Sequence, residues 1–139
     1  MTDANWIFDR AIFLMDEQNE NGGQTHTQDT QAYRDRTLGI LNVLRNEVYP
    51  YSDTFALGCG GKRSICPEIQ SFEQILDIDD AIAQTVLPYG LATHLLLGEN
   101  DTLASFFNDR YQELLRTIGC RRPVVWEDIP SMYQGGVGL

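Results

Sequence analysis

The chain has 139 residues, of which 42% are apolar, and a formal net charge of −10 from 20 acidic and 10 basic residues. A chain of this length buries enough surface for one hydrophobic core, so we expect one domain rather than two. The acidic balance opposes non-specific binding to nucleic acid or to an anionic membrane, because both need clustered Lys and Arg side chains.

The N-terminal segment predicts an amphipathic helix from Asp3 to Gln18. Its apolar residues, between Trp6 and Met15, recur at three- and four-residue spacings, which place them on one face. No basic stretch precedes them and charged residues interrupt them, so we do not expect a signal peptide. Residues 19–30 contain only polar side chains and glycines, which predicts a loop because such a segment has nothing to bury.

A second amphipathic helix is expected to begin near Asp29 or Thr30, whose side chains can accept hydrogen bonds from the first backbone N–H groups. Its apolar stripe runs from Tyr33 to Val48 at helical spacing. Pro50 is expected to end this helix, because proline has no N–H to continue the hydrogen-bond ladder.

The segment between Asp53 and Asp77 changes to short pieces. TFAL is followed by the glycine-rich GCGGK and then by RSICPEI. Glycine adopts the positive φ angles that tight turns need, so we interpret these pieces as a β-hairpin of two brief strands. The same glycines lack the spacing of a phosphate-binding loop, since that pattern needs glycine at Ala56 and a hydroxyl at Arg63.

A third helix is expected to begin near Ser71 or Asp77 and to run through LPYGLATHLLLGEN, residues 87–100. Its apolar residues occupy so much of the circumference that little of the helix can face water, so we place it at the centre of the fold. Pro88 is expected to kink this helix without breaking it, and Gly90 to let a neighbouring helix approach closely. The apolar stretch is too short to cross a bilayer, so no membrane association is expected.

Gly98 suits a left-handed helix C-cap, and Asn100 or Asp101 can start a fourth helix. The short connection makes the third and fourth helices an antiparallel hairpin. The expected fold class is therefore mainly α: a small bundle of about four helices with a short β-hairpin excursion and an extended C-terminal tail. Residues 1–120 form the single helical domain and residues 121–139 form the tail.

The tail, RRPVVWEDIPSMYQGGVGL, contains two prolines and three glycines and has no helical period. Large apolar side chains in such a segment are unfavourable in water unless they meet a surface. That surface is either the domain itself or another chain, and the aromatic residues are of the type that anchors interfaces. The residues expected to form this interface are Val124, Val125, Trp126, Ile129, Met132 and Tyr133.

The cysteines and histidines do not form a recognisable site. Cys59, Cys66 and Cys120 leave one thiol unpaired if any disulfide forms, which favours free thiols in a reducing compartment and leaves their role open. Together with His26 and His94 they lack the spacing of a zinc site. Cys59 with His94 remains open as a nucleophile and base, although a hydrogen-bonded core histidine is the simpler interpretation of His94.

Three carboxylates, Asp77, Asp79 and Asp80, cluster before the third helix. Helix capping and the positive end of the helix dipole account for acidic residues at this position. No catalytic, cofactor-binding or metal-binding residue is therefore predicted, and we expect a non-enzymatic protein.

Three stretches follow one another as a short apolar helix, a longer helix and a helical pair: IFDRAIFLMDE, ILNVLRNEVYPYSDTF and LDIDDAIAQTVLPYGLATHLLLGENDTLASFFNDRYQELL. Together they resemble a family of small structural proteins of tailed phages and prophages, the head-to-tail connectors or adaptors. The resemblance spans residues 6–118 and rests on the order and composition of the segments rather than on a catalytic motif. The tail after Gly119 does not share it.

The resemblance implies a helical core that forms a homo-oligomeric ring on the phage portal, with portal and tail proteins as partners. DNA would pass through the channel without specific nucleic-acid binding, and an acidic wall is compatible with DNA that slides rather than sticks. Such a protein is made in the bacterial cytoplasm and ends in the virion. The alternative is a small acidic binding protein, encoded by a phage or mobile element, that acts on a host factor; an enzyme built on Cys59 and His94 ranks third.

Overall fold

The computed structural model describes residues 1–15, 28, 30–52 and 66–120. Within these residues the protein is mainly α-helical, as the sequence predicts. The α-helices are α1 (Ala4–Leu14), α2 (Gln31–Val48), α3 (Asp80–Leu96) and α4 (Asp101–Cys120), and a short 3-10 helix, η1 (Tyr49–Tyr51), follows α2 directly. The predicted tail, residues 121–139, lies outside the described residues.

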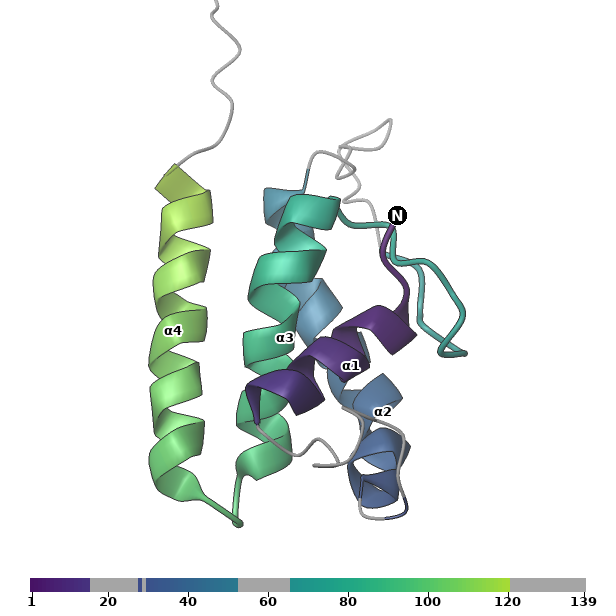
Figure 1. The fold of residues 1–139 in the computed structure, drawn as a ribbon. Coiled ribbons are helices and arrows are strands. Elements are labelled where there is room, and N and C mark those ends of the chain that lie inside the picture. The colour runs from purple at the N-terminus through teal and green to yellow at the C-terminus, as the bar shows by residue number, and fades with distance from the viewer. Residues whose placement is uncertain (16–27, 29, 53–65, 121–139) are drawn as a thin grey trace, which may run out of the picture.

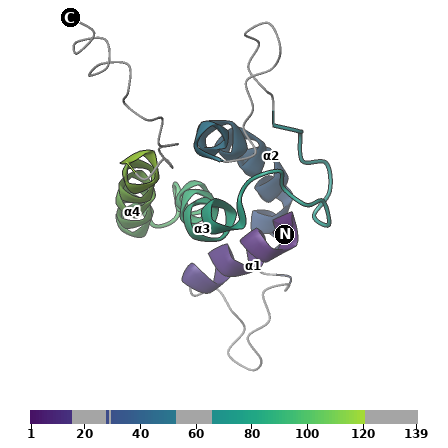
Figure 2. The same ribbon diagram turned by 90° about the horizontal axis from the view of Figure 1, so that it is seen from above.

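The helix α3 stands at the centre of the bundle, and the other helices surround it (Figure 1, Figure 2). α4 lies antiparallel to α3 on one side, whereas α1 and α2 pack against α3 from the other sides (Figure 2). The central position predicted for the third helix is thereby confirmed. α4 is the outermost helix, because its packing against other helices is mainly on α3.

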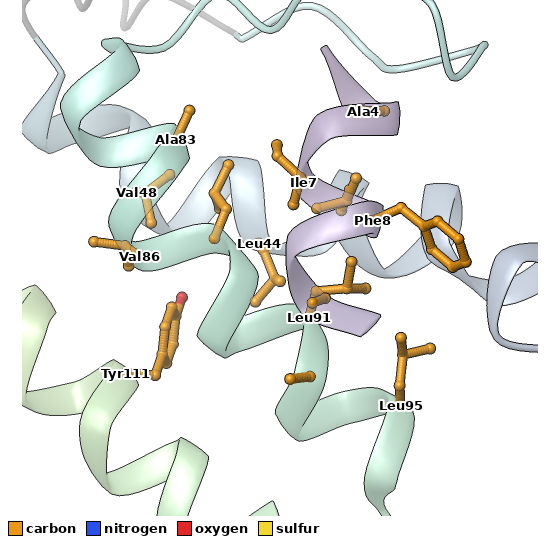
Figure 3. Packing of buried hydrophobic residues seen from close by; sticks show 14 of the residues in the cluster. Ala4, Ile7, Phe8, Leu44, Val48, Ala83, Val86, Leu91, Leu95 and Tyr111 are labelled. Atoms are coloured by element: carbon orange, nitrogen blue, oxygen red, sulfur yellow. The ribbon is translucent and has the colours of Figure 1, made fainter. Parts of the chain in front are cut away.

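Side chains from every α-helix meet around α3 in the hydrophobic core (Figure 3). Full burial of one large aliphatic or aromatic side chain stabilises the fold by roughly 1.5–3 kcal/mol. Core residues drawn in Figure 3 include Ile7 and Phe8 of α1, Leu44 and Val48 of α2, Val86, Leu91 and Leu95 of α3, and Tyr111 of α4. Among the described residues, no helix combines the length and the apolar character needed to cross a membrane.

The proline and glycine in α3 are both accommodated by packing. α3 runs unbroken through Pro88, which confirms the expected continuity, and the expected kink stays a prediction. A Cβ atom added to Gly90 would lie 2.9 Å from the Tyr111 ring and 3.1 Å from the Leu44 side chain. The predicted close approach at Gly90 is confirmed, because α2 and α4 both reach the helix at this point.

The connection between α3 and α4 follows the sequence cues. Gly98 has φ +88°, the left-handed conformation expected of a residue just after a helix. Asn100 caps α4, since its side-chain oxygen accepts a hydrogen bond from the Leu103 N–H at 3.1 Å. The Asp101 carboxylate accepts from the Gly98 N–H at 3.0 Å and closes the turn. The predicted antiparallel hairpin of helices is confirmed (Figure 1).

Helix capping by side chains is present at the start of α1 but absent at the start of α2. Asp3 caps α1 by accepting a hydrogen bond from the Trp6 N–H at 2.8 Å. Thr30 occupies the N-cap position of α2, but its side chain makes no capping hydrogen bond. α2 ends at Val48, and Pro50 lies inside η1, so the chain tightens into a 3-10 turn at the proline.

The expected start of the third helix near Ser71 or Asp77 is wrong, because α3 begins at Asp80. The residues before it pair with the start of the chain instead. Ile75 forms an antiparallel bridge with Asp3, and backbone hydrogen bonds of 3.0 Å join residues 72 and 76 to residues 5 and 2. Backbone groups that are bonded across the chain in this way do not join a helical ladder.

The predicted β-hairpin is not confirmed. Residues 53–65 lie outside the described residues, and the chain from Cys66 to Ile69 is irregular. Side chains of α2 bond to this backbone where a partner strand would do so. Asn42 accepts from the Ile69 N–H at 2.8 Å and donates to the Ile69 carbonyl at 3.0 Å, and Arg45 donates to the Cys66 carbonyl. α2 therefore fixes the described part of this segment.

Candidate functional site

A groove lies between α1 and α4 and crosses α3, and we call it the α1/α4 groove. It encloses about 290 Å³. Its position follows from the packing, because α4 runs along α3 while α1 crosses α3 obliquely (Figure 1). The lining residues are Arg10 and Leu14 of α1, Gln84, Thr85, Pro88 and Tyr89 of α3, and Arg110 and Leu114 of α4.

The α3 side of the groove is shaped by its proline. Pro88 has no N–H, so the carbonyl of Gln84 lacks the donor that an ordinary helical residue would supply. Pro88 is itself buried, whereas Tyr89 is half-buried and packs its ring at 6.0 Å from that of Phe107. Pro88, Tyr89 and Leu114 make the groove mostly apolar.

Two arginines face this surface from opposite helices. The Arg10 guanidinium lies over two rings of its own helix, 4.9 Å from the Trp6 ring centre and 5.7 Å from that of Phe13. Arg110 lies 5.9 Å from the Tyr89 ring centre and pairs with Glu113 at 3.2 Å. Hydrogen bonds to Glu113 and Tyr89 raise the pKa of Arg110 further above its already high usual range. Arg110 is therefore cationic at any physiological pH.

The outer face of α1 continues this surface. A shallow hollow of about 270 Å³ is lined by Trp6, Asp9, Arg10 and Phe13, and it adjoins the α1/α4 groove at Arg10. Phe13 is 55% exposed, which is high for a phenylalanine. Trp, Tyr and Arg are the residue types that contribute most to protein–protein binding energy. The groove and the hollow together are rich in the residue types that are common in protein interfaces.

Cys66, a cysteine whose side chain the structure describes, is buried. Cys66 is 2% exposed, and burial raises the pKa of its thiol above the usual value. A thiol with a raised pKa is a poor nucleophile. Cys59 lies outside the described residues and His94 is half-buried on α3, so the pairing of Cys59 with His94 stays untested.

Asp80, the first residue of α3 and one of the three clustered carboxylates, bonds to the start of the chain. The Asp80 carboxylate accepts hydrogen bonds from the Met1 amino group at 2.9 Å and from the Thr2 hydroxyl at 2.8 Å, and these bonds lower the pKa of Asp80 below its usual range. Asp79 occupies the N-cap of α3, but its side chain makes no capping hydrogen bond, so capping explains this cluster only in part. Within the described ranges, no three His, Cys, Asp or Glu side chains are placed to hold a metal ion.

The interface residues predicted from the sequence, Val124, Val125, Trp126, Ile129, Met132 and Tyr133, all lie outside the described residues. Sequence reasoning missed the α1/α4 groove, because its arginines belong to helices at opposite ends of the chain. The available signal was local: Trp6, Arg10 and Phe13 recur at helical spacing on α1.

No protein-family model matches the chain, and comparisons with curated proteins and with solved structures likewise found no match.

Proposed function

We propose that this protein is a non-enzymatic subunit of a phage head-to-tail connector, which assembles on the portal as a homo-oligomeric ring. The helical segments between residues 6 and 118 support this proposal through their resemblance to connector proteins. The observation that carries it furthest is the α1/α4 groove, an accessible surface on which Trp, Tyr and Arg side chains gather.

A ring needs two different surfaces on each subunit, because a closed cyclic contact of more than two copies joins one patch to a different patch of the next copy. The groove offers one such patch. The aromatic and apolar residues of the tail offer a chemically different one. α4 lies at the outside of the bundle. Arg10 and Arg110, which line the α1/α4 groove, are both exposed, so a neighbouring molecule can reach it.

The charge of −10 is compatible with a place beside passing DNA. An acidic surface repels the phosphate backbone, and it therefore favours sliding of DNA over adhesion. The same charge does not favour a role in packaging that requires a tight grip on DNA.

The test is deletion of the gene from the phage or prophage that carries it, followed by induction and electron microscopy of the lysate. We expect DNA-filled heads and separate tails in place of complete virions, and recovery of virions when the full chain is supplied from a plasmid. Complete, infective particles from the deletion strain would overturn the proposal. A host phenotype in the absence of any virion defect would favour the alternative, an acidic protein that binds a host factor.

A further inference from the structure

The α1/α4 groove combines an apolar surface with two cationic side chains. Pro88, Tyr89 and Leu114 supply apolar contact, and Arg10 and Arg110 approach from α1 and α4 respectively. A partner that fits this arrangement carries large apolar side chains with carboxylates directly beside them.

Both arginines are available to such a partner. Arg10 is exposed, and its guanidinium lies over the Trp6 and Phe13 rings, a contact that does not use its N–H groups. Arg110 already pairs with Glu113, but the two side chains are 43% and 62% exposed. An exposed pair of this kind contributes little stability, so it does not prevent Arg110 from donating to a second carboxylate.

The tail of this chain contains the complementary pattern. Glu127 and Asp128 are adjacent, with Trp126 before them and Ile129 after them. The two adjacent carboxylates can pair with the two arginines of the groove, and the large apolar residues on either side of them can pack on its apolar surface. We propose that the α1/α4 groove binds the tail, residues 121–139, of a second copy of this chain.

The direction of the chain after α4, rather than its reach, favours a second copy over its own groove. The stretch from Cys120 to Glu127 spans at most about 23 Å when extended, and Arg110 lies about 15 Å back along α4 from the end of the helix. To enter its own groove the tail must reverse direction directly after α4. No glycine lies between Cys120 and Gln134 to ease that reversal, and Pro123 favours extended backbone.

A contact of the tail of one copy with the groove of the next joins two different surfaces, so it propagates in one direction and closes into a ring when the rotation allows. The inference deepens the proposed connector function and rests on it for the identification of the ring. The contact itself is open to a test that does not involve a phage.

The test uses two full-length charge-reversal variants. The tail variant carries Glu127→Arg and Asp128→Arg, and the groove variant carries Arg10→Glu and Arg110→Glu. In the tail variant both surfaces are positive, and in the groove variant both are negative. Each surface of one variant therefore complements the opposite surface of the other. Molecular mass is measured by sedimentation velocity over a range of concentrations, for each variant alone and for the equimolar mixture.

We expect the wild-type chain to associate as its concentration rises, and each variant alone to associate at least about tenfold more weakly. The mixture of the two variants should recover association close to that of the wild type. The matched control carries Arg36→Glu and Arg116→Glu, which change the net charge as the groove variant does but replace exposed arginines outside the groove. This control should associate as the wild type does.

Three results would overturn the inference: a wild-type chain that stays monomeric at every concentration, variants that associate as the wild type does, or a mixture that fails to recover association. If the two variants melt at different temperatures from the wild type while all three proteins stay monomeric, each tail binds its own groove. Recovery in the mixture together with intact virions after gene deletion would keep the tail contact and reject the connector. Separate heads and tails after deletion, with variants that assemble normally, would reject only the tail contact.

Discussion

The helices α3 and α4 form one hairpin, but their surroundings differ sharply. In α3, 11 of the 17 residues are buried, and they lie on all sides of the helix. In α4 the buried residues of the described part are Ala104, Phe107 and Tyr111, which lie on one face. Helices pack on α3 from several directions, whereas α4 has α3 as its main neighbour. Stability is therefore concentrated in α3, and the surface of α4 is available for binding.

The comparison also separates two kinds of sequence constraint. A substitution in α3 meets another helix in almost any direction, so size and polarity are restricted at most positions. A substitution on the outer face of α4 meets water. Four predictions test this difference, and three of them compare a buried position with a matched exposed one.

The largest effect is expected from Leu91→Asp in α3. Leu91 is fully buried, and a carboxylate there would have no partner, so we expect a loss of more than about 4 kcal/mol and failure to fold. Leu97→Asp is the matched control, because Leu97 is 56% exposed directly after the same helix. Circular dichroism melts of both variants decide the point. A similar melting temperature for the two would show that α3 is not the centre of the fold.

The next effect is expected from Gly90→Ala. Alanine favours a helix by about 1 kcal/mol over glycine, but at Gly90 the new methyl group would lie 2.9 Å from the Tyr111 ring and 3.1 Å from Leu44. We expect the crowding to win and to give a net loss of about 1–3 kcal/mol. Gly39→Ala in α2 should instead stabilise the protein by about 0.5–1 kcal/mol, since nothing lies within 4 Å of a Cβ atom there. Urea denaturation measures both, and equal signs for the two variants would contradict the packing described at Gly90.

The central position of α3, its end at Gly98 and the start of α4 at Asn100 were predictable because local sequence determines them. The nearly continuous apolar surface of the third helix places it inside whatever its neighbours are. Gly98 ends it in the left-handed conformation, and Asn100 begins the next helix, because both effects depend on side chains within one turn. The role of Gly90 was also foreseen, although the identity of its neighbours, Leu44 and Tyr111, was not.

The features that could not be predicted depend on contacts between distant residues. The start of α3 moved to Asp80 because Ile75 pairs with Asp3, and no local pattern encodes that pairing. The segment after Cys66 is held by Asn42 of α2 rather than by a strand. The α1/α4 groove escapes prediction for the same reason, since it exists only once α1 and α4 have packed on α3.

A smaller effect, dependent on pH, is expected from Tyr111→Phe. The Tyr111 hydroxyl donates to Glu47 at 2.5 Å, and burial together with this carboxylate raises the pKa of Tyr111 well above its usual range. At neutral pH the loss of the hydrogen bond should cost about 1 kcal/mol.

Above the ordinary tyrosine pKa of 10.0, the unfolded wild-type chain releases the Tyr111 proton while the folded chain keeps it. Wild-type stability should therefore fall as the pH rises past this value, and the Phe variant should lose less over the same range. Urea denaturation is measured for both proteins at about pH 7, 9, 10 and 11, which covers the range in which tyrosine ionises. The slope of the free energy of unfolding against pH is then compared between the wild type and the Phe variant. Equal slopes would mean that Tyr111 ionises in the folded state as easily as in water.

The smallest effect is expected from Phe106→Ala on the outer face of α4. Phe106 is 63% exposed, and its described ring contact is with Phe107, at 5.8 Å between ring centres. Removal of this ring loses little buried area, and alanine gains helix propensity, so the change in the free energy of unfolding should stay within about 0.5 kcal/mol. Its neighbour Phe107 is 4% exposed, and Phe107→Ala should cost about 3–5 kcal/mol through the cavity it leaves.

Adjacent residues of one helix with the same side chain thus provide a direct measure of how one-sided the packing of α4 is. Both variants are compared by urea denaturation at low protein concentration, where association contributes least. If Phe106→Ala costs more than about 1 kcal/mol under those conditions, beyond what an exposed substitution does, then the outer face of α4 is covered within the monomer. In that case the difference between α3 and α4 is smaller than their described surroundings indicate, and α4 is a second buried helix rather than the open edge of the bundle.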